Sequence, residues 1–180
     1  MSTIEQQVEQ DIPTGTWAAD TVHSSLVFEV PYAVATFHGE VPAFEASLVD
    51  GTLTGVAQIA SVTVKDENLQ AHLASPEFFD AERHPKVTFI SSEIRRDGDR
   101  VELPGELTIK GITKAATLAG TIAGPTVDHF GATRVGLQLE TTVDRTQFGM
   151  TWNMPLPNGA PALSNDVTLK AELTLVGQEG

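Results

Sequence analysis

The chain of 180 residues contains no cysteine. This absence excludes disulfide bridges, thiolate nucleophiles and zinc sites built on thiolates. No apolar run reaches the roughly eighteen residues that a membrane-spanning helix needs. A chain of this length still buries about 70% of the surface that its unfolded form exposes, so a hydrophobic core alone can stabilise it.

Basic residues are also scarce, because 11 Lys and Arg stand against 24 Asp and Glu and give a formal net charge of −13. A nucleic-acid-binding protein needs a basic surface to replace the counterions of phosphate, so no nucleic-acid partner is expected. The first residues, MSTIEQQVEQDIP, lack the basic segment and the following apolar segment of a secretory leader. The sequence therefore predicts a cytoplasmic protein with no stable membrane insertion.

The chain does contain a period-two alternation of apolar and polar residues, which is typical of strands with one face toward a core. The alternation is clearest over residues 135–143 and 167–175. Residues 1–14 are predicted to be a flexible lead-in, and residues 15–180 a single domain. Further strand-like runs occur at residues 25–30, 41–48, 55–64, 86–94, 101–109 and 117–124.

Turn signals separate these runs, at Asp50-Gly51, Asp97-Gly98, Lys110-Gly111 and Gly124-Pro125. Glycine accepts the positive φ of a tight hairpin turn, so neighbouring strands are expected to pair as antiparallel hairpins. About eight or nine such strands predict an all-β fold, either a closed barrel or a sandwich. Short helices are expected at residues 31–37, 67–73 and 144–150.

No catalytic or metal-binding signature stands out. The histidines lack the His-x-His or His-x3–5-His spacing of zinc sites, and they are His23, His38, His72, His84 and His129. Carboxylates are abundant, but none forms a marked pair, and no G-x-S-x-G, Walker or G-x-G-x-x-G sequence occurs. The sequence predicts a protein that is not an enzyme and that uses no metal and no cofactor.

The aromatic residues are eight Phe, two Trp and one Tyr. Two interpretations of these rings are open, an ordinary filled core or the lining of a cavity for an apolar ligand. Small residues at Ala57, Ala60 and Ser61 favour the cavity, because they leave space inside a barrel. The adjacent rings of Phe78 and Phe79 lie in a polar stretch and must be buried against the rest of the domain.

Four sequence motifs follow one another along the chain. They are D-x-x-H-S with F-x-V over residues 20–30, H-L-x-S-P-x-F-F-D over residues 72–80, G-x-L-T-I-x-G-x-T-K over residues 105–114, and R-x-x-F-G-M over residues 145–150. With these motifs in this order over residues 17–176, the sequence resembles the YceI-like family.

The resemblance implies an eight-stranded antiparallel barrel of lipocalin-like shape, with short helices and an elongated apolar cavity. It implies a lipid-binding carrier that holds an isoprenoid lipid, of polyprenyl or isoprenoid quinone type. Dimers are known in the family, so a homodimer is an expected assembly. The expected ligand-binding residues are Phe28, Tyr32, Phe37, Phe44, His72, Phe78, Phe79, Phe89, Arg145, Phe148 and Trp152.

The sequence departs from the family at two places. Residues 69–70 are Leu-Gln where members often carry Arg-Asp, and Tyr32 replaces a common histidine. Both departures predict a different preference for the lipid head group. Arg134, Arg145 and His72 are candidates for the polar end of the cavity, with a structural salt bridge as the other role for Arg145.

Two other functions are also compatible with the sequence. One is a structural or stress-response interaction module with a packed barrel and no ligand, and the other is an enzyme that acts on an isoprenoid substrate. A continuous apolar cavity favours the carrier, whereas a packed interior favours the module. A strongly shifted titratable group inside the cavity would favour the enzyme.

Overall fold

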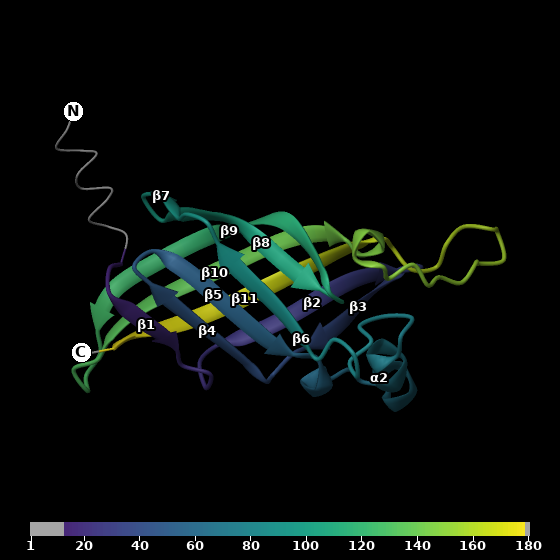
Figure 1. Ribbon diagram of the computed structural model, residues 1–180, viewed down its shortest axis with the longest axis horizontal. Coiled ribbons are helices and arrows are strands. Elements are labelled where there is room, and N and C mark those ends of the chain that lie inside the picture. Colours follow the sequence, from purple (N-terminus) through teal and green to yellow (C-terminus); the bar gives the residue numbers. More distant parts are fainter. Residues whose placement is uncertain (1–12, 179–180) are drawn as a thin grey trace.

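The computed structural model describes residues 13–178, whose eleven strands form one antiparallel sheet that closes into a barrel (Figure 1). Most of the predicted lead-in, residues 1–12, lies outside the described residues. The helical segments are η1 (Ile59–Ser61), α2 (Glu67–Ala74) and η2 (Arg145–Phe148). The strands are β1 (Thr16–Ala19), β2 (Ser25–Tyr32), β3 (Ala35–Glu40), β4 (Phe44–Val49), β5 (Thr52–Gln58), β6 (Lys86–Ser91), β7 (Arg95–Asp97), β8 (Arg100–Ile109), β9 (Ile112–Val127), β10 (Thr133–Asp144) and β11 (Asp166–Gln178).

Eight strands form the closed wall, in the order β1-β4-β5-β6-β8-β9-β10-β11, and β11 pairs back with β1. Closure depends on the length of β11, whose residues 175–178 pair with β1 while residues 168–172 pair with β2. The predicted eight-stranded antiparallel barrel is confirmed, and the sandwich is excluded. An eight-stranded barrel has an interior wide enough for one small ligand.

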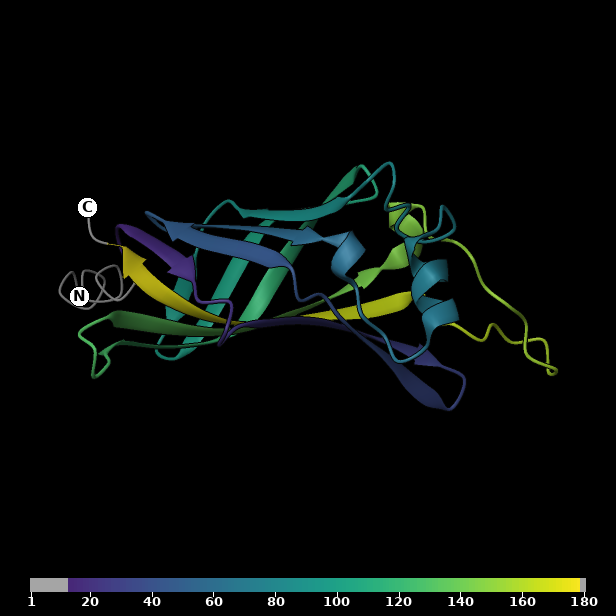
Figure 2. The same ribbon diagram turned by 90° about the horizontal axis from the view of Figure 1, so that it is seen from below.

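The β2–β3 hairpin extends the wall at one end of the barrel, where α2 also lies (Figure 2). The helix expected over residues 31–37 is wrong, because these residues end β2 and begin β3. Pro31 lacks the N–H that a helix interior needs, and Phe37 pairs with Val30 across the hairpin. Ala33, with φ 52°, makes the tight turn between the two strands.

The predicted hairpin turns are confirmed at three places. Asp50-Gly51 joins β4 to β5, Asp97-Gly98 leads from β7 to β8, and Lys110-Gly111 joins β8 to β9. In the first and third turns both residues have positive φ, between 49° and 85°. This is the backbone geometry that suits the right-handed twist of the flanking strands.

The turn expected at Gly124-Pro125 is wrong, because β9 continues through both residues. The pairing of β9 with β10 shifts register between Arg134 and Gly136, directly opposite. Proline offers no N–H to a ladder, and such an irregularity in the pairing tolerates it. The result is one long, bent strand instead of two strands.

Asp66 caps the N-terminus of α2, and its carboxylate accepts hydrogen bonds from the N–H groups of Asn68 (2.8 Å) and Leu69 (3.2 Å). These bonds satisfy two amides that have no partner within the helix. Ser75 caps the C-terminus, and its hydroxyl donates to the carbonyl of His72 (2.5 Å). The helix predicted over residues 67–73 is therefore confirmed.

Two further segments differ in detail from the sequence expectations. The helical turn expected over residues 144–150 is the short η2. The strand expected over residues 55–64 stops at Gln58, where η1 begins. The first part of this segment belongs to β5 in the barrel wall, and the residues after Gln58 connect β5 to α2 at the end of the barrel.

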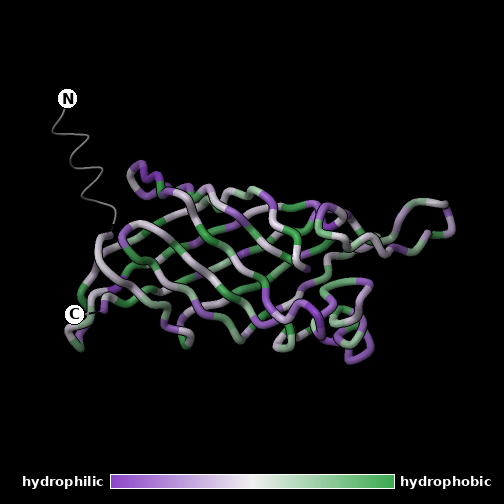
Figure 3. The backbone as a smooth tube through the Cα atoms, viewed as in Figure 1, coloured by the Kyte–Doolittle hydropathy of each residue, from purple (hydrophilic) through white to green (hydrophobic). Residues whose placement is uncertain are grey.

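The interior is built by the alternation that the sequence predicts. Val135, Leu137 and Leu175 are fully buried, and Gln138, which follows Leu137, is exposed. Figure 3 shows hydrophobic and hydrophilic residues alternating along the strands of the wall. Among residues 13–178, no helix combines the length and the apolar composition that crossing a bilayer requires.

Candidate functional site

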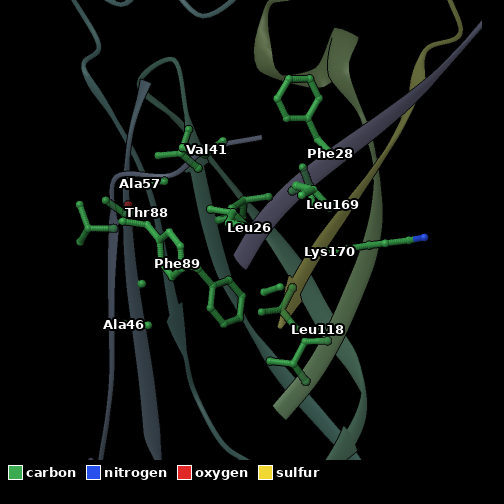
Figure 4. Close-up of a pocket in the computed structure, with 18 of the residues that line it drawn as sticks. Leu26, Phe28, Val41, Ala46, Ala57, Thr88, Phe89, Leu118, Leu169 and Lys170 are labelled. Carbon is green, nitrogen blue, oxygen red and sulfur yellow. The ribbon is translucent and has the colours of Figure 1, made fainter. Parts of the chain in front are cut away.

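An apolar cavity of about 140 Å³ lies inside the barrel, and we call it the core cavity. Leu26, Phe89, Leu118 and Leu169 approach it from different walls, whereas the ammonium of Lys170 points away (Figure 4). That ammonium donates a hydrogen bond to a carboxylate of β2 (3.1 Å). The core cavity therefore offers a hydrocarbon surface with almost no polar atoms.

A second cavity of about 430 Å³ lies at the end of the barrel, and we call it the mouth cavity. It is enclosed by the β2–β3 hairpin, by α2 and by the chain that follows η2. Its volume lies within the range of about 300–1,000 Å³ typical of small-molecule sites. Its polar lining residues are Tyr32, Thr36, His72 and Arg145, and the rest of the lining is apolar.

The two cavities adjoin, because Phe28, Phe79, Ile109 and Leu169 line both of them. The rings of Phe28 and Phe79 meet edge to face, with centroids 6.1 Å apart. Phe28 lies over its cross-strand partner Gly39, where a Cβ atom would collide with the ring. This glycine gives Phe28 the room to stand between the two cavities.

Three rings are stacked edge to face at the mouth cavity. The centroid of His72 lies 4.8 Å from that of Phe78 and 4.7 Å from that of Trp152. The Nε2 atom of His72 lies 2.8 Å from a carboxylate oxygen of Glu77. The Phe78 ring, which the sequence predicts to be buried, packs against His72 and Trp152.

Arg145 is the most deeply buried charged side chain at the site, with an exposed fraction of 2%. Its guanidinium donates to the carbonyls of Met150 (2.7 Å), Trp152 (2.8 Å) and Ser164 (2.9 Å), with a longer bond to Leu163 (3.5 Å). Burial lowers the pKa of the guanidinium, and the nearby Asp144 opposes this shift. The salt bridge expected for Arg145 is replaced by hydrogen bonds to backbone carbonyls.

The carbonyls of Trp152, Leu163 and Ser164 belong to the two ends of one long loop, residues 151–165, which we call the mouth arm, and Met150 directly precedes it. The arm projects beyond the barrel (Figures 1 and 2). The side chain of Asn153 bonds both the N–H (2.9 Å) and the C=O (2.7 Å) of Leu163 across its base. Arg145 and Asn153 therefore hold the two ends of the arm together beside the mouth cavity.

The structure brings almost all of the expected ligand-binding residues to the two cavities. The exception is Phe148, which lines neither cavity because its ring is packed into the hydrophobic core with an exposed fraction of 2%. Those at the core cavity are Phe28, Phe44, Phe79 and Phe89; those at the mouth cavity are Phe28, Tyr32, Phe37, His72, Phe78, Phe79, Arg145 and Trp152. Their contact with a lipid stays a prediction.

Arg134, a candidate for the polar end, lines neither cavity. It bonds Asp20 (3.0 Å) and Asp128 (2.7 Å). Hydrogen bonds lower the pKa of both carboxyls, from His23 and Arg134 to Asp20 and from Arg134 to Asp128. Arg134 is therefore part of a surface ion-pair network.

Sequence reasoning missed Ile109 and Leu169, which line both cavities. The alternating pattern predicts that Leu169 lies on the inward face of its strand. It does not predict where along the barrel axis a cavity lies, and so it does not identify Leu169 as a lining residue. Among residues 13–178, no three His, Asp or Glu side chains are grouped to hold a metal ion.

Comparison with known proteins identifies the family. The YceI-like domain matches residues 17–175. A UPF0312 protein of Pectobacterium atrosepticum is 35% identical over 94 residues, which are 52% of this chain and 49% of that protein. The chain thus spans about half the length of that relative.

Two solved structures share the fold. The crystal structure of Burkholderia cenocepacia BcnA has a TM-score of 0.75 at 20% identity and covers 87% of this chain and 98% of its own. A polyisoprenoid binding domain from Saccharophagus degradans, implicated in plant cell wall breakdown, has a TM-score of 0.69 at 12% identity and covers 90% and 98%. With the family match over nearly the whole barrel, this chain belongs to the YceI-like domain family.

Proposed function

We propose that the protein is a carrier of an isoprenoid lipid, with the tail in the core cavity and the head in the mouth cavity. The two apolar cavities carry this proposal, because they adjoin one another from the end of the barrel to its interior and share four lining residues. The polyisoprenoid binding domain from Saccharophagus degradans has the same fold, which supports the same class of ligand here.

The proposed orientation follows from where the polar groups lie. Tyr32, Thr36, His72 and Arg145 line the mouth cavity, whereas the core cavity is nearly free of polar atoms. Each buried methylene-sized group contributes about 0.8 kcal/mol to binding, so a tail of several five-carbon units binds tightly without polar contacts. A head group, by contrast, costs energy if it is buried without hydrogen-bond partners.

We propose further that the head group carries no negative charge. The donors of Arg145 are taken up by backbone carbonyls, and His72 lies against Glu77. Both family departures that the sequence contains, Leu69 and Tyr32, line the mouth cavity without supplying a cation. A quinone or an alcohol suits this lining better than a phosphate does.

This proposal predicts selectivity between lipids that share one tail. We expect a polyprenyl phosphate to bind about tenfold more weakly than the corresponding polyprenol, a difference of about 1.4 kcal/mol. Competition against a fluorescent isoprenoid measures the ratio. Leu69→Arg should narrow it by adding a cation at the mouth cavity, whereas Val22→Arg, outside both cavities, should not. Equal affinities for both lipids in the unmodified protein would contradict a neutral head group.

We also propose that the barrel holds its ligand without transforming it. The ionisable side chains that line the mouth cavity are Tyr32, His72 and Arg145. The guanidinium of Arg145 already donates its hydrogen bonds to backbone carbonyls. The His72–Glu77 pair lies toward solvent, with side-chain exposures of 30% and 54%. This arrangement supports binding more than acid–base catalysis, which needs a positioned group with a matched pKa.

Native mass spectrometry of the purified protein tests the proposed function directly. We expect an added mass that organic extraction releases as an isoprenoid quinone or a polyprenol. A ligand-free mass that stays unchanged after incubation with several isoprenoid lipids would overturn the carrier and favour the interaction module.

A further inference from the structure

Two segments beside the mouth cavity contain no charged residue, although the chain has a net charge of −13. One is the mouth arm, residues 151–165, and the other is residues 30–37, which include the turn of the β2–β3 hairpin. They are far apart in the sequence but meet at the end of the barrel. The Ala33 N–H donates to the Ala162 carbonyl (2.8 Å), and the Ser164 N–H donates to the Pro31 carbonyl (2.9 Å).

This charge-free surface exposes large apolar side chains. Val34 is fully exposed, and Met154 and Tyr32 have exposed fractions of 54% and 44%. Tyr32 also lines the mouth cavity, so the exposed surface is continuous with the cavity lining. Contiguous exposed apolar surface is characteristic of sites that contact a protein or a membrane.

The surface is held in place by an ordered scaffold. Within the arm, the Leu156 N–H donates to the Ala160 carbonyl (2.7 Å), and the Ala162 N–H donates to the Met154 carbonyl (2.9 Å). The guanidinium of Arg145 joins both ends of the arm through the carbonyls of Trp152 and Ser164. The apolar side chains are thus presented outward and do not fold back onto the barrel.

We infer that this surface docks on a lipid bilayer whose head groups carry no net charge. The inference rests on the proposed function, because an isoprenoid lipid dissolves in a bilayer and reaches the mouth cavity most directly if the mouth faces that bilayer. Apolar and tyrosine side chains enter the boundary between head groups and acyl chains at low cost. The negative net charge elsewhere on the chain repels anionic membranes, so the docking is reversible and favours zwitterionic lipid.

Vesicles of phosphatidylcholine without any isoprenoid test the surface, because their binding needs no ligand in the barrel. We expect the protein to co-float with these vesicles. The variant V34D/M154D should reduce the bound fraction by about tenfold, since it places two carboxylates in the contact surface. The control is F130D, because Phe130 has an exposed fraction of 84% in the β9–β10 turn, at the opposite end of the barrel (Figure 1).

Equal flotation of V34D/M154D and the unmodified protein would overturn the inference, as would an equal loss of flotation in F130D. Sedimentation velocity tests the alternative that a second copy of the chain binds this surface, because it distinguishes a dimer from a monomer. If V34D/M154D converts a dimer to a monomer while vesicle binding is unaffected, the surface is a self-association face and the inference fails. Ligand-free native mass spectra together with normal flotation would reject the proposed function but leave the docking surface standing.

Discussion

Replacing Arg145 with methionine should lower the free energy of unfolding by about 3–5 kcal/mol. The substitution keeps an apolar stem but removes the donors that the carbonyls of Met150, Trp152 and Ser164 share. Buried carbonyls left without donors are costly, and those of Trp152 and Ser164 come from the two ends of the mouth arm. Urea unfolding measures the change, and proteolysis within residues 151–165 should accelerate in the folded protein.

Arg134→Met is the matched control for this experiment. The Arg134 side chain is 31% exposed and bonds carboxylates that water can also solvate, so its loss should shift the unfolding midpoint less. Arg145→Lys should fall between Arg145→Met and the unmodified protein, because an ammonium cannot reproduce the planar set of donors. Similar midpoints for Arg145→Met and Arg134→Met would mean that the backbone bonds of Arg145 contribute little.

A tryptophan at Ala35 should reduce the affinity for an isoprenoid lipid by at least about tenfold, or about 1.4 kcal/mol. Ala35 lies at the start of β3, where it is exposed and lines the mouth cavity. A large ring there occupies the space that the lipid must cross, while strands tolerate aromatic residues well. Titration with a fluorescent isoprenoid measures the affinity, and thermal unfolding checks that the fold is intact.

Ala115→Trp controls for the added ring, because Ala115 is exposed on β9 and lines neither cavity. It should bind the lipid as the unmodified protein does. If Ala35→Trp binds equally well and unfolds at the same temperature, lipid does not enter through the mouth cavity. A loss of binding in both variants would point to an effect of the ring that is unrelated to the cavity.

Several features of the fold follow from local sequence alone. The alternation over residues 135–143 and 167–175 predicts two strands and their buried faces, because side chains on a strand point to opposite sides in turn. Glycine at residues 51 and 111 predicts two hairpin turns, because each turn needs a positive φ. Together with four ordered motifs, these local rules are sufficient to predict the barrel and its family.

The sequence predicts the cavity lining less completely, because it does not give the position of each inward residue along the barrel axis. Most of the expected rings do line a cavity, but Phe148 is packed in the core and Leu169 was not expected at the site. A period of two separates inward from outward residues and says nothing about how far along the barrel each one lies. The rings that stand between the core and mouth cavities, Phe28 and Phe79, are 51 positions apart in the sequence, so no local pattern predicts that they meet.

The amino-acid sequence is sufficient to predict the all-β fold class, the inward faces of the strands, the exclusion of thiol chemistry and the family. The bonds of Arg145 to backbone carbonyls are visible only in the folded protein, because the ends of the mouth arm must first lie beside β2 before their carbonyls surround the guanidinium. Likewise, residues 30–37 and 151–165 are each merely uncharged in sequence. They become one surface beside the mouth cavity because strand pairing, which acts between distant residues, brings them together.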